Sequence, residues 1–150
     1  MRKTALTTIA LTLFACLHAP SAIAGEQTLK YKLGYFLLGQ KDGESHFMGV
    51  TIAPDGTLGT KDFFDKAGEN GASTGHSTYY FPKGSLIMTY AGVGTGTQNG
   101  GHYKGKYQII SGAGAYQGAT GTGVFEGDWG DASPLKNANL MDVELDIKTP

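Results

Sequence analysis

The chain has 150 residues, which suits one domain and leaves no room for two. Gly accounts for 24 of the 150 residues, charged residues make up 17% and aromatic residues 11%. Disordered chains are poor in aromatic residues and rich in charge, and Gly is among the worst helix formers. The composition therefore argues against a disordered chain and against a helical bundle. Collagen is excluded because the glycines follow no three-residue period and Pro occurs only 5 times.

Residues 1–24 have the layout of a secretory signal peptide. Arg2 and Lys3 give a positive start, an apolar run extends from Ala5 to Leu17, and Ala22-Ile23-Ala24 matches an A-x-A cleavage site. The apolar run is shorter than the roughly 20 residues that a membrane-spanning helix needs. We therefore expect an exported protein, periplasmic or secreted, with no membrane span.

A lipoprotein anchored at Cys16 is the alternative. Leu13-Phe14-Ala15-Cys16 loosely resembles a bacterial lipobox, in which the Cys carries lipid. Phe14 stands where such motifs usually have a small residue, and a cleavage site follows downstream. Both observations favour the ordinary signal peptide.

Residues 25–150 then form the mature chain, which we expect to be a single domain. It contains no Cys and no Arg, and it carries a mildly negative net charge. Without disulfides, a secreted domain depends on its hydrophobic core and its hydrogen-bond ladders. An acidic surface without Arg argues against a nucleic-acid partner and against an anionic membrane.

The mature chain shows the period-two alternation of β-strands throughout. The clearest case is near the end, where Met141, Val143, Leu145 and Ile147 alternate with charged residues. The sequence predicts eight strands, at 29–36, 46–53, 57–64, 73–81, 86–97, 102–111, 119–129 and 141–148.

Turn residues separate these strands, as at Asp42-Gly43 and Asn99-Gly100-Gly101, while Asp65–Gly71 is polar and predicted to be a loop. We expect only Asp65–Glu69 and Ala115–Ala119 to hold a short helical turn. Eight strands joined by hairpins form either a sandwich or an up-and-down barrel. Gly permits the tight bends and bulges that close a small barrel, so we predict an all-β fold, an eight-stranded antiparallel up-and-down β-barrel.

The segment from His102 to Gly127 is the most specific in the chain. It contains Gly112-Ala113-Gly114, then Tyr116, then Gly118-Ala119 and Gly121-Thr122-Gly123-Val124-Phe125. We expect Gly112 and Gly114 to permit a sharp bend with positive φ, and Tyr116 to plug one end of the barrel.

This segment resembles the hallmark of the allene oxide cyclase barrel and dirigent-like superfamily. The resemblance implies an eight-stranded antiparallel barrel, a homo-oligomer and an apolar cavity that shapes a reactive small molecule. Some members cyclise or isomerise a polyene or an epoxide, whereas dirigent members steer radical coupling with little chemistry of their own. No residue aligns with the cavity Glu of the plant cyclases (Glu44 is nearest but lies beside a turn), and the pocket Arg of dirigent proteins is missing. No catalytic residue is therefore carried over.

Three His residues remain in the mature chain, at 46, 76 and 102. Their spacing is not a local metal-ligand motif, so we expect no metal site. They are either polar residues near strand ends or, in the alternative, a general acid–base group, for which His76 is the candidate, or a haem or metal ligand.

The position of Glu126 depends on which face of its strand points inward. If Phe125 and Trp129 point into the barrel, Glu126 points out and is only solvated. If the strand has the opposite orientation, Glu126 is a buried carboxylate with a raised pKa and a candidate proton donor or acceptor.

Aromatic residues on the central strands are either core residues or the wall of a small-ligand pocket. As ligand-binding candidates we take Tyr79, Tyr90, Tyr103, Tyr107, Phe125 and Trp129.

Three functions stay open at this point. The first is the binding of a small apolar molecule inside the barrel, as in a dirigent-like protein. The second is a cyclase or isomerase of the allene oxide cyclase type, and the third is a secreted structural or interaction protein with a filled barrel. The mature chain has neither a catalytic thiol nor a phosphate-binding loop before a helix, so no cofactor is expected.

Overall fold

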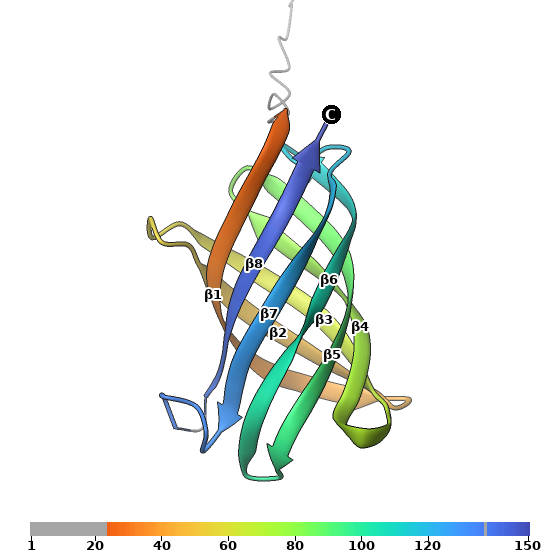
Figure 1. Ribbon diagram of the computed structural model, residues 1–150, viewed down its shortest axis with the longest axis vertical. Coiled ribbons are helices and arrows are strands. Elements are labelled where there is room, and N and C mark those ends of the chain that lie inside the picture. The colour runs from red at the N-terminus through yellow and green to blue at the C-terminus, as the bar shows by residue number, and fades with distance from the viewer. Residues whose placement is uncertain (1–23, 137) are drawn as a thin grey trace, which may run out of the picture.

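The computed structural model describes residues 24–136 and 138–150, so the predicted signal peptide lies outside the described residues except for Ala24. The chain forms a closed barrel in which each strand pairs antiparallel with its neighbours in sequence, and β1 pairs with β8 (Figure 1). The predicted eight-stranded up-and-down barrel is thus confirmed. The elements are β1 (Gly25–Lys41), β2 (Glu44–Ile52), β3 (Leu58–Ala67), the 3-10 turn η1 (Glu69–Gly71), β4 (Ala72–Phe81), β5 (Gly84–Thr97), β6 (Gly100–Gly114), β7 (Thr120–Gly130) and β8 (Asn139–Thr149).

Strand β1 closes the barrel because it pairs with two strands, β2 and β8. Its first part pairs with β8 from Gly25 to Tyr35, and its second part pairs with β2 from Lys32 to Lys41. Only the residues Lys32–Tyr35 pair with both β2 and β8. A register shift between Leu37 and Gly39 adds a local irregularity, of the kind that increases strand bend and twist.

The β1–β2 hairpin confirms the predicted Asp42-Gly43 turn. Both residues have positive φ, 53° and 79°, as a type I′ turn requires. The expectation for Gly112 and Gly114 holds only at Gly114, with φ 65°. Gly112 has no positive φ; a Cβ there would lie 2.9 Å from the Cβ of Tyr116, so the close approach of Tyr116 explains this glycine.

The predicted loop at Asp65–Gly71 begins too early. Strand β3 continues to Ala67, with Asp65 paired to Ser45 of β2 and to Gly75 of β4. Backbone pairing on both sides compensates for the polar sequence here. Of the two predicted helical turns, the first occurs later, at Glu69–Gly71, and the second is a set of hydrogen-bonded turns around Tyr116.

The interior of the barrel is asymmetric along its axis. Near the chain termini, Leu33, Tyr79, Leu86 and Leu145 have no exposed surface. Tyr116 is 5% exposed and its ring packs edge-on against Phe81 at 5.8 Å, so it plugs this end as predicted. These buried side chains lie toward the upper end in Figure 1, where the C-terminus lies.

Candidate functional site

The lower half of the barrel encloses a cavity of about 270 Å³. It lies near the ends of the strands that meet at the β1–β2, β3–β4, β5–β6 and β7–β8 connections. Its wall consists of aromatic rings with a few polar groups: Tyr35, Phe47, Lys61, Phe63, Asp65, Tyr90, Tyr103, Tyr107, Phe125, Trp129, Asn139 and Met141.

Glycines of neighbouring strands make room for the rings of this wall. A Cβ on Gly92 would lie 2.6 Å from the Tyr103 hydroxyl, and one on Gly94 would lie 3.3 Å from the Trp129 ring. A Cβ on Gly105 would overlap the ring of Phe125. The glycine-rich composition therefore serves the interior as well as the bends: wherever β5 or β6 turns a glycine inward, a ring from the next strands covers it.

Lys61 of β3 is the only buried lysine in the described part of the chain, at 2% exposure. Its Nζ donates a hydrogen bond to the Tyr107 hydroxyl at 2.8 Å and lies 4.0 Å from the centre of the Phe63 ring. The rings of Tyr79, Tyr90 and Tyr107 surround it at 5.0–5.4 Å. Burial lowers the Lys61 pKa from 10.5 to about 7, and the negative charge of Asp65 partly opposes this shift.

Tyr107 connects Lys61 to a second phenol. Its hydroxyl accepts a hydrogen bond from Tyr79 at 3.3 Å, and burial raises its pKa well above 10.0. Because its pKa is so high, Tyr107 stays a neutral phenol at physiological pH and can donate as well as accept. Three strands thus contribute one continuous buried polar chain: Lys61 of β3, Tyr107 of β6 and Tyr79 of β4.

Asp65 supplies a carboxylate to the same cavity. Its Oδ1 accepts a hydrogen bond from Tyr90 at 2.9 Å, and the same hydroxyl lies 3.0 Å from the carbonyl oxygen of Phe64. Tyr103 bonds to Ser73 nearby, and burial raises its pKa to about 12. The cavity thus combines an apolar wall with an amine, a carboxylate and several phenols.

Sequence reasoning found most of the aromatic wall. Five of the six predicted ligand-binding residues line the cavity, and Tyr79 lies beside it as the partner of Tyr107. It missed Lys61 and Asp65. Both share the inward face of β3 with Phe63, so period-two alternation could have revealed them. A charged residue at an inward position is normally taken to mean that the inward and outward faces of the strand have been assigned the wrong way round.

The predicted acid–base residues are not in the cavity. Glu126 points outward while Phe125 and Trp129 point inward, so the outward orientation applies. His76 is also on the outer face, where its ring stacks on Phe64 at 4.8 Å. A general acid–base role would require a side chain inside the barrel, and neither Glu126 nor His76 lies there.

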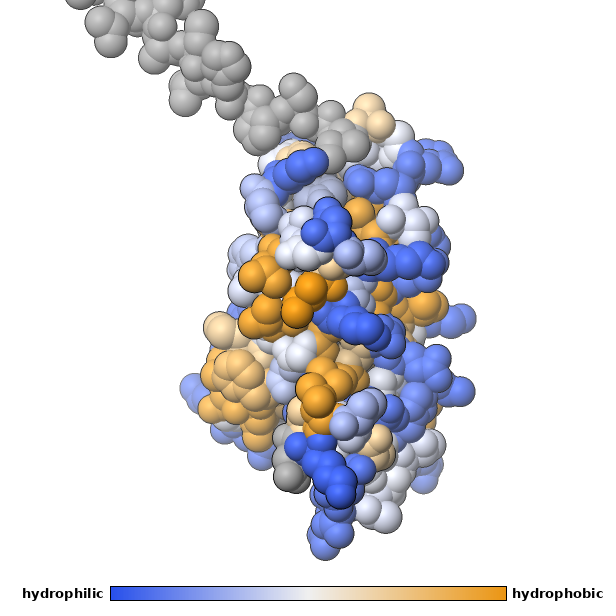
Figure 2. Space-filling view, turned by 90° about the vertical axis from the view of Figure 1, so that its left-hand side faces the viewer, coloured by the Kyte–Doolittle hydropathy of each residue, from blue (hydrophilic) through white to orange (hydrophobic). Residues whose placement is uncertain are grey.

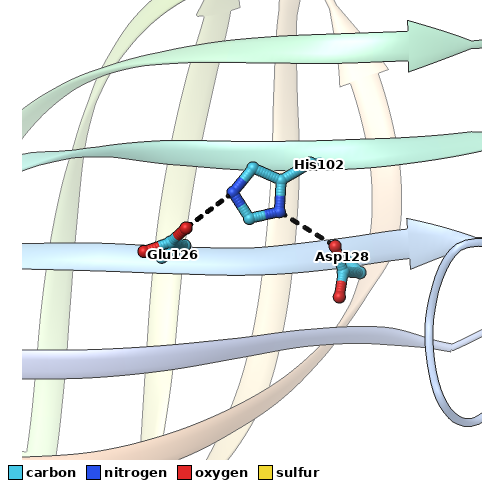
Figure 3. A network of polar contacts seen from close by, with 3 residues as sticks. All are labelled: His102, Glu126 and Asp128. Atoms are coloured by element: carbon cyan, nitrogen blue, oxygen red, sulfur yellow. Dashed lines mark hydrogen bonds and ion pairs between the residues drawn. The ribbon is translucent and has the colours of Figure 1, made fainter.

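Glu126 instead belongs to an outer-surface network around His102 (Figure 3). His102 Nε2 lies 3.0 Å from Glu126 Oε1, and its Nδ1 lies 2.9 Å from Asp128 Oδ1. The hydrogen bond with Asp128 is the main cause of a raised His102 pKa, and that with Glu126 adds to it. The imidazole thus ties β6 to β7 on the outside of the barrel.

A larger groove of about 530 Å³ runs over the outer face near the β2–β3 turn. Its charged side chains are already paired, Lys30 with Glu144 at 2.9 Å and Lys32 with Asp142 at 2.7 Å. Within residues 24–136 and 138–150, no group of His, Cys, Asp and Glu could hold a metal ion, and no helix has the length and hydropathy to cross a membrane.

Neither a protein-family model nor a curated protein sequence matches the chain. The likeness of residues 102–127 to the allene oxide cyclase and dirigent-like superfamily therefore stays a prediction.

Proposed function

We propose that the barrel binds one small, apolar, ring-containing molecule in the cavity at its lower end. The observation that carries this proposal is a hollow of about 270 Å³ walled by nine aromatic and apolar residues, next to a half whose inward side chains are buried. A barrel of eight strands has room inside for its own side chains or for one small ligand. Unfilled space at native packing density costs stability, which favours a cavity that has an occupant.

The volume limits the size of the ligand. An apolar cavity of about 150 Å³ holds a benzene molecule. The present cavity, at about 270 Å³, accommodates a molecule of roughly naphthalene size. Flat rings would stack on Phe47, Phe125 and Trp129, and the polar groups of Lys61 and Asp65 would orient one substituent.

The chain contains one Trp, Trp129, and it lies in the cavity wall. Its fluorescence therefore reports on occupancy. Titration with the naphthalene-sized dye 2-naphthylamine is expected to quench Trp129 by energy transfer and to increase the emission of the dye. Saturation at one dye per chain supports the proposal, and the absence of saturable binding contradicts it.

A pair of variants on β8 locates the binding. Asn139 lines the cavity and Leu140, the next residue, faces outward. Asn139→Phe fills the cavity and should weaken dye binding at least tenfold, while Leu140→Phe should leave it unchanged. Equal effects of both variants would mean that the dye binds elsewhere.

An isomerase of small epoxides is the second candidate, and Asp65 is the observation that favours it. As the benzylic C–O bond of an epoxide such as styrene oxide breaks, the Asp65 carboxylate can take a proton from the carbon that keeps the oxygen and return it to the benzylic carbon, and Lys61 can stabilise the oxyanion. Styrene oxide matches the cavity in size. This candidate is supported if the wild type isomerises styrene oxide to phenylacetaldehyde and Asp65→Asn abolishes the reaction while still binding the dye. If the wild type shows no turnover, ligand binding is the only proposed function that remains.

The outer surface bears on the expected homo-oligomer. Apolar side chains gather on the face at the left of Figure 1, as Figure 2 shows. Exposed apolar residues of β1–β4 include Phe36, Met48, Val50, Ile52, Leu58 and Tyr80. We infer that this face would form the contact between copies, and light scattering of the wild-type chain and Val50→Lys tests it.

A further inference from the structure

The amine of Lys61 is unusual because it is buried without a direct ion pair, and the carboxylate of Asp65 acts on it only from a longer distance. No carboxylate of residues 24–136 or 138–150 forms an ion pair with it, and its one hydrogen-bond partner is the Tyr107 phenol. A buried, unpaired amine costs stability, which an apolar side chain of the same volume would avoid. We propose that Lys61 is a nucleophile that forms an imine with the aldehyde or ketone group of the ligand bound in this cavity. This inference rests on the proposed function, because the carbonyl compound must first enter the cavity.

The surroundings of Lys61 favour the reactive form of its side chain. Burial among Phe63, Tyr79, Tyr90 and Tyr107 keeps a large fraction of the amine neutral at physiological pH, and only a neutral amine has the electron pair needed for attack. The nine other described lysines are all exposed, so none of them has the apolar surroundings of Lys61. Reactivity should therefore be concentrated at one position.

The chemistry of imine formation needs only the groups present. The lone pair of Nζ forms a bond to the carbonyl carbon, the C=O π electrons move to oxygen, and a proton passes from nitrogen to that oxygen. The resulting carbinolamine then loses its hydroxyl as water while the nitrogen lone pair forms the C=N bond. One amine and one carbonyl thus give one imine and one water, without an oxidant or reductant.

Tyr107 is placed to assist the loss of water. Its hydroxyl is 2.8 Å from Nζ, so it can donate a proton to the departing oxygen and recover one from the nitrogen. Tyr79, at 3.3 Å from Tyr107, keeps that phenol hydrogen-bonded while it does so. Tyr107 is therefore the proton donor of the proposed step, and Tyr79 is a positioning residue.

Asp65 distinguishes a carbonyl ligand from a carboxylate ligand. A fatty or aromatic acid could pair with protonated Lys61, but it would then share a small apolar cavity with the carboxylate of Asp65. Like charges in such a site repel each other strongly. A neutral aldehyde avoids this repulsion, and once the imine is protonated, Asp65 stabilises its positive charge. The cavity therefore suits a neutral carbonyl compound better than an acid.

The test uses three naphthalene ligands that differ in one group: 2-naphthaldehyde, 2-naphthylmethanol and 2-naphthoate. The wild-type chain is incubated with the aldehyde and sodium cyanoborohydride, which reduces an imine to a stable secondary amine. Intact mass spectrometry is expected to find one naphthylmethyl group per chain, and peptide mapping to place it on Lys61. The dye displacement assay measures the binding of all three ligands in parallel.

Three variants distinguish the role of the nucleophile, the role of the proton donor and the background reaction of exposed lysines. Lys61→Met should lose the adduct, and dye titration of the same variant measures how much cavity binding remains. Tyr107→Phe should slow adduct formation at least tenfold at a saturating concentration of aldehyde. Lys66→Met, which removes an exposed lysine of the same strand, should react like the wild type.

The outcomes are distinct. A single adduct on Lys61 that depends on Tyr107 supports the inference. Adducts scattered over exposed lysines, or naphthoate bound more tightly than the aldehyde without any adduct on Lys61, overturn it but leave the proposed cavity binding intact. Failure of all ligands and of the dye to bind overturns the proposed function instead.

Discussion

The amine nitrogen of Lys61 lies 2.8 Å from the phenol oxygen of Tyr107, and this contact crosses the interior of the barrel. The two residues belong to β3 and β6, which are not neighbours in the sheet. Lys61 is 2% exposed and Tyr107 is 3% exposed. The contact also marks the boundary between the filled half of the barrel and the hollow half. Stability and the proposed imine chemistry would therefore depend on the same pair.

Replacement of Lys61 by Met should stabilise the protein and change its pH dependence. The Lys61 pKa is about 7 in the folded chain and 10.5 in the unfolded chain, so between these values the unfolded state binds the extra proton. The free energy of unfolding of the wild type should then rise from pH 7 toward pH 10. Lys61→Met should lack this rise and be more stable at pH 7 and below by a few kcal/mol.

Tyrosines limit this effect at high pH. Burial raises the pKa values of the phenols that face Lys61 above 10.0, so they hold protons that the unfolded chain loses above that pH. Wild-type stability should therefore fall again above pH 10. Urea unfolding followed by circular dichroism across pH 6–11 tests both the rise in stability toward pH 10 and the fall above it. Equal pH profiles for wild type and Lys61→Met would contradict the assignment. The titratable groups concerned are Asp65, Tyr35, Tyr79, Tyr90, Tyr103 and Tyr107.

Removal of the Tyr107 hydroxyl should destabilise the protein. Tyr107→Phe leaves the buried amine of Lys61 without its hydrogen-bond partner, which costs about 1–3 kcal/mol. The matched control is Tyr80→Phe, because Tyr80 is 51% exposed on the outer face. Its effect on the free energy of unfolding should stay within about 0.5 kcal/mol. Similar values for the two variants would argue against the buried contact.

The sequence predicted the fold well because alternation and turns are local signals. β8 shows the clearest alternation, and its buried residues Met141, Val143, Leu145 and Ile147 are those that the pattern pointed inward. The Asp42-Gly43 turn was likewise recognisable from two residues. The aromatic candidates follow from a set of tyrosines on the central strands and from the shared face of Phe125 and Trp129, and five of the six line the cavity.

The polar centre of the cavity could not be predicted in the same way. The hydrogen-bond partner of Lys61 is Tyr107, which is 46 residues away in sequence and on a strand that is not adjacent to β3. Asp65 was assigned to a loop because its neighbours are polar. In physical terms, a buried lysine is tolerated only when specific tertiary partners surround it, and no local pattern in the sequence reports those partners.

The inward glycines lead to a further prediction. A Cβ on Gly105 would overlap the Phe125 ring and the carbonyl of Ala91 and lie 2.7 Å from the Cα of Gly92. Gly105→Ala should therefore destabilise the barrel by about 1–3 kcal/mol and shift the Phe125 ring into the cavity, so that dye affinity falls. Gly39→Ala is the matched control. Nothing lies within 4 Å of a Cβ there, so its stability should be unchanged or slightly increased.

The outer network of His102 should be independent of the cavity. Asp128→Asn removes the largest cause of the raised His102 pKa, so that pKa should fall toward 6.5. Glu126→Gln should lower it less, because its hydrogen bond is the weaker cause. NMR titration of the imidazole measures both shifts, and dye titration of the same samples measures the cavity.

We expect dye affinity and imine formation to be unchanged in both variants. The reason is that Glu126 and Asp128 point away from the interior that Phe125 and Trp129 line. A loss of ligand binding or of turnover in Glu126→Gln, with a normal circular dichroism spectrum, would instead place the active carboxylate on the outer face. Because His102 loses its extra proton as the pH rises, the small stabilisation from this network should also disappear as the pH rises through and above 6.5.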